Sequence, residues 1–99
     1  MPSSTFRFHP EARDEFRDAA RWYRARDGRA SSEFRVAVSN AIRVIVEASH
    51  RCPKYLHGTR RFVMQRFPFS VVYLDDPELI TIIAIAHSKR KPGYWKDRV

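Results

Sequence analysis

The hydrophobic pattern of the chain changes its period twice, from strand-like to helical and back to strand-like. Within residues 5–9, Phe6 and Phe8 alternate with Arg7, which predicts a short strand with one buried face. Two stripes of apolar side chains at helical spacing follow and predict two amphipathic helices. The first stripe comprises Ala12, Phe16, Ala19, Ala20 and Tyr23, and the second comprises Phe34, Val38, Ala41, Ile42 and Ile45.

Residues at the ends of these stripes predict where the helices begin and end. Pro10 suits the first position of a helix, and Asp27-Gly28 is typical of a helix end. Ser31 or Ser32 is available as the cap of the second helix. Because only a few residues separate the stripes, we expect the two helices to form an antiparallel hairpin.

Three further strands are predicted where extended apolar runs return; they span residues 60–67, 69–74 and 79–87. Pro68 and the sequence Asp75-Asp76-Pro77-Glu78 separate these runs and have the residue types of turns. The last run, LITIIAIAH, is almost continuously apolar and β-branched, which is typical of a strand buried on both faces. We expect an α+β fold in the order β-α-α-β-β-β, in which a hairpin of helices covers one face of an antiparallel sheet.

A chain of 99 residues can bury one core, and we expect a single domain over residues 1–99. Trp22 lies at the border of the first helical stripe, where it would either seal the core or face a partner. The side chains expected in the core are Phe16, Tyr23, Phe34, Ile45, Val71, Ile82 and Ile85.

Composition limits the class of protein. The chain is 43% hydrophobic, which indicates a globular protein, and no apolar run approaches the roughly 20 residues that span a bilayer. Residues 1–10 lack the hydrophobic segment of a secretion signal, so we expect a cytoplasmic protein without a membrane partner. The single Cys52 permits neither an internal disulfide nor a Cys-x-x-Cys zinc motif, and we expect no metal or other cofactor.

The formal net charge of +8 is distributed unevenly. Residues 11–27 carry five acidic and five basic side chains, which is the even mixture of a solvated helix face. Residues 51–66 carry five basic side chains and no acidic one, and residues 89–98 carry five basic side chains against Asp97. Two separate basic clusters in so short a chain indicate an anionic partner, either a nucleic acid or an acidic protein segment.

The second basic cluster directly follows the buried strand and contains two large aromatic residues. Lys89, Arg90 and Lys91 are followed by Tyr94 and Trp95. A segment that only solubilises the chain rarely carries adjacent aromatic side chains. We therefore interpret residues 87–95 as a functional segment positioned by the end of the strand.

This order of elements, together with several local motifs, resembles the RelE/ParE superfamily of type II toxin–antitoxin toxins. The resemblance covers essentially the whole chain. Its most specific parts are FPFSVVY at residues 67–73 and AIAHSKRKPGYW at residues 84–95. Residues 12–16, Trp22-Tyr23, Arg61 and Phe62 also belong to it.

The resemblance implies a bacterial toxin that arrests growth and is neutralised by a small cognate antitoxin. RelE-like toxins cut messenger RNA on the ribosome, whereas ParE-like toxins poison DNA gyrase. An acidic and apolar antitoxin segment that folds on binding would suit the cationic surface of this chain. The residues expected to bind it are Trp22, Arg60, Arg61 and Arg66.

The two branches imply different roles for the end of the chain. In a metal-independent nuclease, His87 would act as the base, Arg90 would stabilise charge and Tyr94 would act as the acid. RelE-like nucleases typically carry an arginine where this chain has Ser70, and the Pro-Gly-Tyr-Trp ending resembles the ParE-like branch. We therefore expect gyrase as the target and no catalysis by the toxin itself. The residues expected to bind the target are Lys89, Arg90, Lys91, Tyr94 and Trp95.

Three alternatives remain open at this stage. The messenger-RNA nuclease is the first, and a non-toxic basic module that binds nucleic acid is the second. In the third, the residues have structural roles: His87 is hydrogen-bonded to the backbone at a strand end, and Arg90 pairs with an acidic residue of the helical hairpin.

Overall fold

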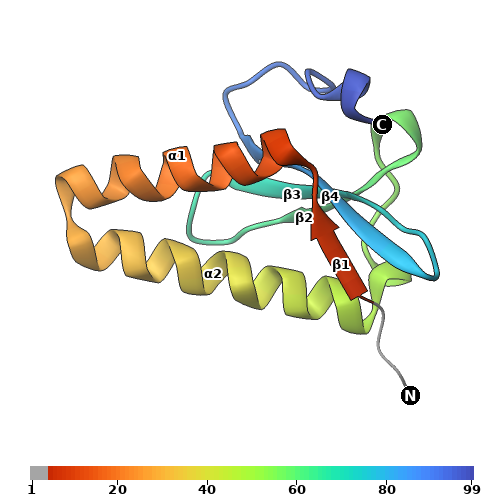
Figure 1. The fold of residues 1–99 in the computed structure, drawn as a ribbon, viewed down its shortest axis with the longest axis horizontal. Helices are drawn as coiled ribbons and strands as arrows, with labels where there is room; N and C mark the ends of the chain where they lie inside the picture. Colours follow the sequence, from red (N-terminus) through yellow and green to blue (C-terminus); the bar gives the residue numbers. More distant parts are fainter. Residues whose placement is uncertain (1–4) are drawn as a thin grey trace.

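The computed structural model describes residues 5–99 and has helices and strands in the order expected from the sequence. A helical hairpin lies against one face of a four-stranded sheet, and the segment after the last strand extends beyond the hairpin (Figure 1). The elements are β1 (Thr5–Phe8), α1 (Pro10–Arg26), α2 (Gly28–Glu47), β2 (Arg60–Val63), β3 (Phe69–Leu74) and β4 (Leu79–His87). Three short 3-10 turns, η1 (Ser49–Arg51), η2 (Leu56–Gly58) and η3 (Lys96–Arg98), complete the described chain. The predicted α+β fold is confirmed.

The sheet is mixed, with the strand order β1-β4-β3-β2. Strands β2, β3 and β4 form the predicted antiparallel meander. Strand β1 instead runs parallel to β4, from the pair Thr5–Leu79 to the pair Phe8–Ile82, so the expectation of a wholly antiparallel sheet is corrected. Alternation of apolar and polar residues determines which face of a strand is buried, but it carries no information about the direction of a neighbouring strand.

Asp27 forms the connection between the two helices of the hairpin. Asp27 donates its N–H to Tyr23 O over 2.7 Å, and its Oδ1 accepts the N–H of Arg29 over 3.0 Å. Asp27 therefore ends α1 and caps α2, which begins at Gly28. The prediction of Ser31 as a cap is wrong: Ser31 is buried inside α2 and donates its hydroxyl to Ala20 O over 2.9 Å.

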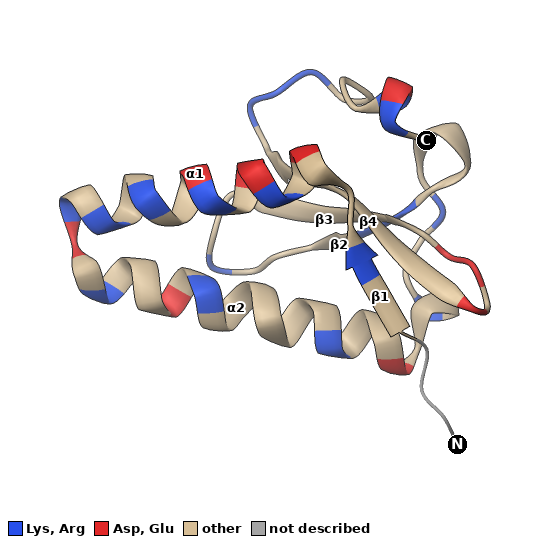
Figure 2. Cartoon of the chain, in the orientation of Figure 1, with Lys and Arg blue, Asp and Glu red and all other residues tan. Residues whose placement is uncertain are grey.

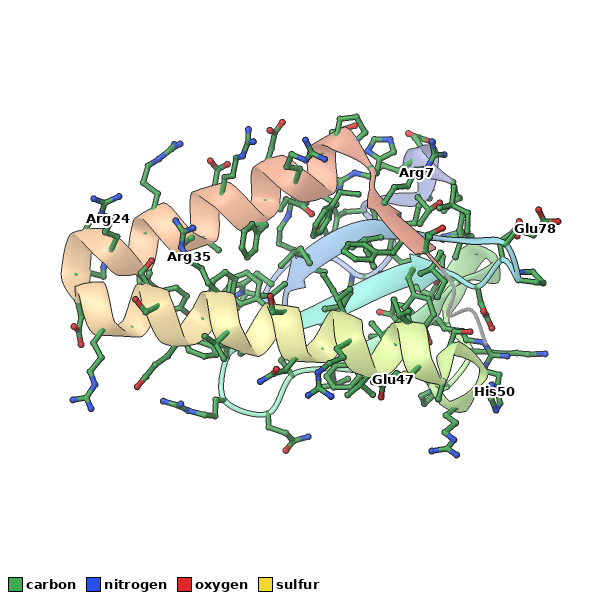
Figure 3. The ribbon with its side chains drawn as sticks, turned by 60° about the horizontal axis from the view of Figure 1, so that its bottom comes forward. Arg7, Arg24, Arg35, Glu47, His50 and Glu78 are labelled. Atoms are coloured by element: carbon green, nitrogen blue, oxygen red, sulfur yellow. The ribbon has the colours of Figure 1, made fainter. Side chains whose placement is uncertain are left out.

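The core between the hairpin and the sheet is built from the predicted stripes. Phe34, Ile45, Val71, Ile82 and Ile85 are buried as expected. Phe16 and Tyr23 are half-buried and pack against the same cluster. Polar residues of the hairpin such as Arg24, Arg35 and Glu47 point to solvent (Figure 3). Neither helix of the described residues is long and apolar enough to cross a membrane.

Strand β4 is buried on both faces, as the sequence predicted. Its second face packs in a smaller cluster with Val72 and Trp95. Tyr73 pairs with Ile82 and Val72 pairs with Ala84, so Ile83 is an extra residue that forms a β-bulge. Because of the bulge, Ile82 and Ile85 both face the helices although an odd number of positions separates them.

Candidate functional site

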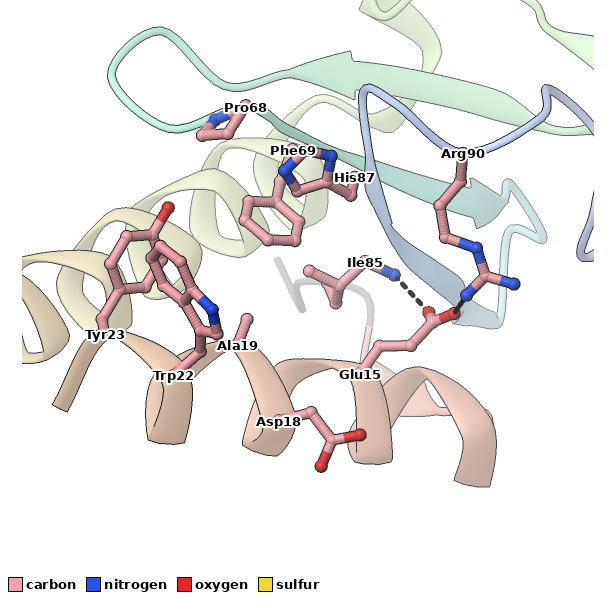
Figure 4. Close-up of a pocket in the computed structure, with 10 residues that line it drawn as sticks. All are labelled: Glu15, Asp18, Ala19, Trp22, Tyr23, Pro68, Phe69, Ile85, His87 and Arg90. Carbon is pink, nitrogen blue, oxygen red and sulfur yellow. Dashed lines mark hydrogen bonds and ion pairs between the residues drawn. The ribbon is translucent and has the colours of Figure 1, made fainter. Parts of the chain in front are cut away.

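A single carboxylate on α1 holds the segment that follows β4. Both oxygens of Glu15 accept hydrogen bonds from Arg98, over 3.0 and 2.9 Å. Glu15 also accepts the Tyr94 hydroxyl over 2.6 Å and the Ile85 N–H over 3.0 Å. The guanidinium of Arg90 lies 3.6 Å from the same carboxylate (Figure 4). We call Glu15, Tyr94, Arg90 and Arg98 the Glu15 cluster.

The position of the Glu15 cluster follows from the length of β1. Pairing of β1 with β4 reaches Ile82, and the N–H of His9 then donates to Ile82 O over 2.9 Å. Beyond that point β4 has no neighbouring strand on this side, and Glu15 accepts its Ile85 N–H. Arg98 in turn donates to Ile83 O over 3.1 Å. Two charged side chains thus satisfy backbone groups that would otherwise lack partners in a half-buried region.

Glu15 and Arg98 were not predicted from the sequence as site residues. Glu15 lies three positions after Ala12 and four before Ala19, which is within the apolar stripe of α1. An acidic residue at a core-facing position of a helix was the available signal, because a charge rarely occupies such a position without a partner. For Arg98, close to the end of the sequence, no local pattern identifies the partner.

Tyr94 is a member of this cluster and is only partly exposed. Burial, together with its hydrogen bond to Glu15, raises the pKa of Tyr94 well above the usual value for tyrosine. A hydroxyl that holds its proton this tightly is a weak acid near neutral pH. The hydrogen bond to Glu15, together with the raised pKa, therefore disfavours Tyr94 as the proton donor of a nuclease.

Arg90 combines internal contacts with exposure. Its guanidinium lies 3.7 Å from the centre of the Tyr94 ring, and 53% of its side chain is exposed. Arg90 thus forms the ion pair with an acidic residue of the helical hairpin that the structural alternative describes. Arg90 is thus held in place while much of its charge still faces solvent.

The two remaining aromatic residues of the segment have structural contacts. His87 accepts the N–H of Lys89 at its Nδ1 over 3.0 Å, and its ring packs edge-on against Phe69. His87 is therefore hydrogen-bonded to the backbone at the strand end, as the structural alternative describes. Trp95 is 1% exposed and closes the second face of the sheet, so its side chain cannot reach a target in this structure. The expected role of Trp95 in target binding stays a prediction, and the structure supports a structural role for its side chain.

The exposed positive charges of this segment lie between His87 and Trp95. Lys89 and Lys91 are exposed, and neither has an ion-pair partner within residues 5–99. In Figure 2 the segment after β4 shows as a basic stretch above α1. Lys89, Arg90 and Lys91 form what we call the basic turn.

The structure does not bring the residues expected to bind an antitoxin into one surface. Arg60 is half-buried and is engaged internally with Asp75 and the carbonyl of Cys52. Arg66 pairs with Glu33 of α2 over 2.9 Å. Trp22 is 52% exposed on α1, and Arg61 lies on the sheet face away from the helices.

Trp22 lines an open groove of about 460 Å³ between α1, the end of β4 and the turn before β3. Its walls are mostly apolar, and Glu15 and Arg90 lie at one end (Figure 4). The residues lining it are Glu15, Asp18, Ala19, Trp22, Tyr23, Pro68, Phe69, Ile85, His87 and Arg90. Within residues 5–99, no group of three or more His, Cys, Asp or Glu side chains has the arrangement of a metal site.

A helical hairpin on a mixed four-stranded sheet, followed by a basic segment, is the arrangement expected for the RelE/ParE superfamily. Residues 6–92 match the family described as ParE toxin of type II toxin-antitoxin system, parDE, and the chain belongs to this family. Its fold is similar to that of a chain in the structure "Chromosomal ParDE TA system from P. aeruginosa", with a TM-score of 0.75 at 13% identity. The similarity covers 87% of this chain and 97% of that chain. Comparison with curated proteins gives no match.

Proposed function

We propose that this ParE-family toxin arrests growth by poisoning DNA gyrase through its basic turn, without catalysis of its own. The observation that carries the proposal is the anchored basic turn: Arg90 is fixed by Glu15 and Tyr94, while Lys89 and Lys91 beside it are exposed and unpaired within the described chain. A cationic surface held in one conformation loses little entropy when it binds an anionic target.

The messenger-RNA nuclease is less consistent with the same residues. Ser70 occupies the position where an arginine would stabilise the transition state, and a serine hydroxyl carries no charge. The Tyr94 hydroxyl is bonded to Glu15, and His87 Nδ1 accepts a backbone N–H. The expected acid and base are thus both engaged in structural hydrogen bonds.

We also propose that a ParD-type antitoxin neutralises the toxin by packing an apolar segment into the groove beside Trp22. The groove is mostly apolar, and Trp22 and Phe69 offer aromatic surfaces on its two sides. Arg66, 68% exposed, could pair with acidic residues that flank the antitoxin's anchor. Charge pairs of this kind guide association, while apolar contacts hold the complex together.

The test of the target combines two assays on the purified toxin, one of gyrase supercoiling with trapping of cleaved DNA complexes and one of messenger cleavage on translating ribosomes. The basic turn is neutralised by combining Lys89→Gln, Arg90→Gln and Lys91→Gln. The control combines Arg13→Gln, Arg17→Gln and Arg24→Gln, which removes the same charge from exposed positions of α1. We expect the first variant to lose at least 10-fold in gyrase inhibition and the control to lose less than 3-fold, because only the first removes contact charges.

Three results would contradict the proposal. Codon-positioned cuts in messenger RNA with unaffected gyrase would favour the nuclease. Equal losses in both triple variants would mean that overall charge, rather than the basic turn, determines inhibition. If neither gyrase nor messenger RNA is affected and growth is normal, the non-toxic nucleic-acid-binding alternative would gain support.

A further inference from the structure

The sheet face away from the helices contains a small polar hollow. Strand pairing places Arg61 beside Val72, and Ser70 beside Ala86, on this face. The segment after β4 forms the opposite wall with Lys91. The volume of this sheet hollow is about 80 Å³. Sites for drug-sized ligands are usually larger than about 300 Å³, so the sheet hollow suits one small group.

Arg61 is oriented for binding an anion in the sheet hollow. Its guanidinium carbon lies over the Tyr55 ring, 4.1 Å from the ring centre. None of the ion pairs in residues 5–99 involves Arg61. A guanidinium that packs on an aromatic ring can still bind phosphate and carboxylate oxygens in pairs through its N–H groups.

The other residues that line the sheet hollow also favour an anion. Arg90 and Lys91 contribute positive charge from the opposite wall, and Ser70 and Ser88 contribute hydroxyl groups that can donate hydrogen bonds. Within the described chain, no Asp or Glu lines the hollow. Several donors and cations without a carboxylate indicate a site for an anion, not for a metal cation or an amine.

We propose that the sheet hollow binds one backbone phosphate of a DNA strand, with Arg61 as the main ligand. This inference rests on the proposed function, because a toxin bound to gyrase lies next to the DNA that gyrase holds. The hollow admits a phosphate group but not a base, and the recognition is therefore independent of sequence. The basic turn contacts the target, and the sheet hollow behind it holds the strand.

The test measures binding of a ten-nucleotide single-stranded DNA to the complete toxin by NMR and by fluorescence anisotropy. We expect the largest shifts at the backbone amides of Arg61, Ser70 and Lys91. Arg61→Gln should lower the affinity at least 5-fold and reduce the slope of log K against log salt by about 0.7, the value for one phosphate contact on a single strand. Arg61→Lys keeps the charge but lacks the planar fork of N–H groups, so its loss of affinity should be intermediate.

The matched control is Arg35→Gln, which removes the same charge from an exposed position on α2. It should change the affinity less than 2-fold. Equal losses in Arg61→Gln and Arg35→Gln, or shifts spread over the whole surface, would overturn the proposal. A thermal melt of each variant establishes that it is folded before binding is compared.

Binding of an RNA strand with the same sequence is measured for comparison, to distinguish DNA from RNA as the source of the phosphate. Binding of DNA at least as tight as RNA supports the proposal, whereas binding of RNA alone would overturn the assignment to DNA. The outcome is independent of the gyrase assay. If the toxin does not inhibit gyrase but DNA still binds in the sheet hollow, only the proposed function is contradicted. If the toxin inhibits gyrase but its DNA binding does not depend on Arg61, only the proposal for the sheet hollow is contradicted.

Discussion

Glu15 concentrates more interactions than any other residue of the site. Its side chain is 15% exposed and lies between Arg98, which is 10% exposed, and the more exposed Arg90. An ion pair this deep gains little net stability over an apolar pair of the same size, because both charges lose their hydration. The ion pair instead has a positioning role. It connects Arg98 to α1 and thereby fixes the orientation of the basic turn.

We predict that Glu15→Gln destabilises the protein by about 3 kcal/mol, because the nearly buried Arg98 loses the closer of its two carboxylate partners and keeps only the exposed Glu11, at 3.7 Å. Urea unfolding measures the loss. The matched control is Asp18→Asn, one turn later on α1, whose 73% exposed side chain makes only a surface pair. The control should change stability by less than about 0.5 kcal/mol. Similar stabilities for the two variants would mean that the Glu15 cluster contributes nothing that a surface pair does not.

At the scale of elements, the segment after β4 forms a structural layer of the fold. It covers the second face of β4 and β3, where Trp95 packs with Val72, Ile83 and Ala84. The bulge at Ile83 creates this second cluster, because it places Ile83 and Ala84 on the same side. The basic turn is therefore held at one end by a strand and at the other by a buried indole.

We predict that Trp95→Ala lowers the free energy of unfolding by about 3–5 kcal/mol, since it removes a fully buried aromatic side chain. Thermal and urea unfolding measure the change, and Lys96→Ala, at an exposed neighbouring position, is the control. Any loss of toxicity in Trp95→Ala should follow the loss of folded protein. A fully stable Trp95→Ala variant that no longer inhibits its target would instead give Trp95 a direct contact role.

At the scale of the whole molecule, two candidate binding surfaces lie on different sides of the sheet. The apolar groove lies between α1 and β4, and the sheet hollow lies on the face of the sheet away from the helices. Only His87 and Arg90 line both. The surfaces proposed for the antitoxin and for the target are therefore distinct and meet at the basic turn.

We predict growth arrest when the chain is expressed alone and normal growth when its cognate antitoxin is present. Trp22→Ala should weaken antitoxin binding at least 10-fold, because it removes an exposed aromatic anchor from the groove. Titration calorimetry measures the affinity, and Val36→Ala, an exposed apolar residue of α2 outside the groove, is the control. Normal growth at confirmed expression would contradict an active toxin, and equal affinities of the two variants would place the antitoxin elsewhere.

The sequence by itself determined the elements and their buried faces. The helical stripes from Ala12 to Tyr23 and from Phe34 to Ile45 are local periodicities, and they predict the hairpin before any contact is known. The run LITIIAIAH predicts a strand buried on both sides for the same reason. The cap was missed at Asp27 because Asp and Ser are equally good caps and composition does not choose between them.

Only the tertiary structure decided what the end of the chain does. Glu15 and Arg98 meet across 83 positions, and no local pattern relates two residues so far apart. The same is true of Trp95, whose burial depends on the face that the bulge at Ile83 creates. The direction of β1 also depends on pairing rather than on side-chain pattern. Local sequence fixes which residues can be buried, whereas the partners that distant residues find depend on how the elements pack together.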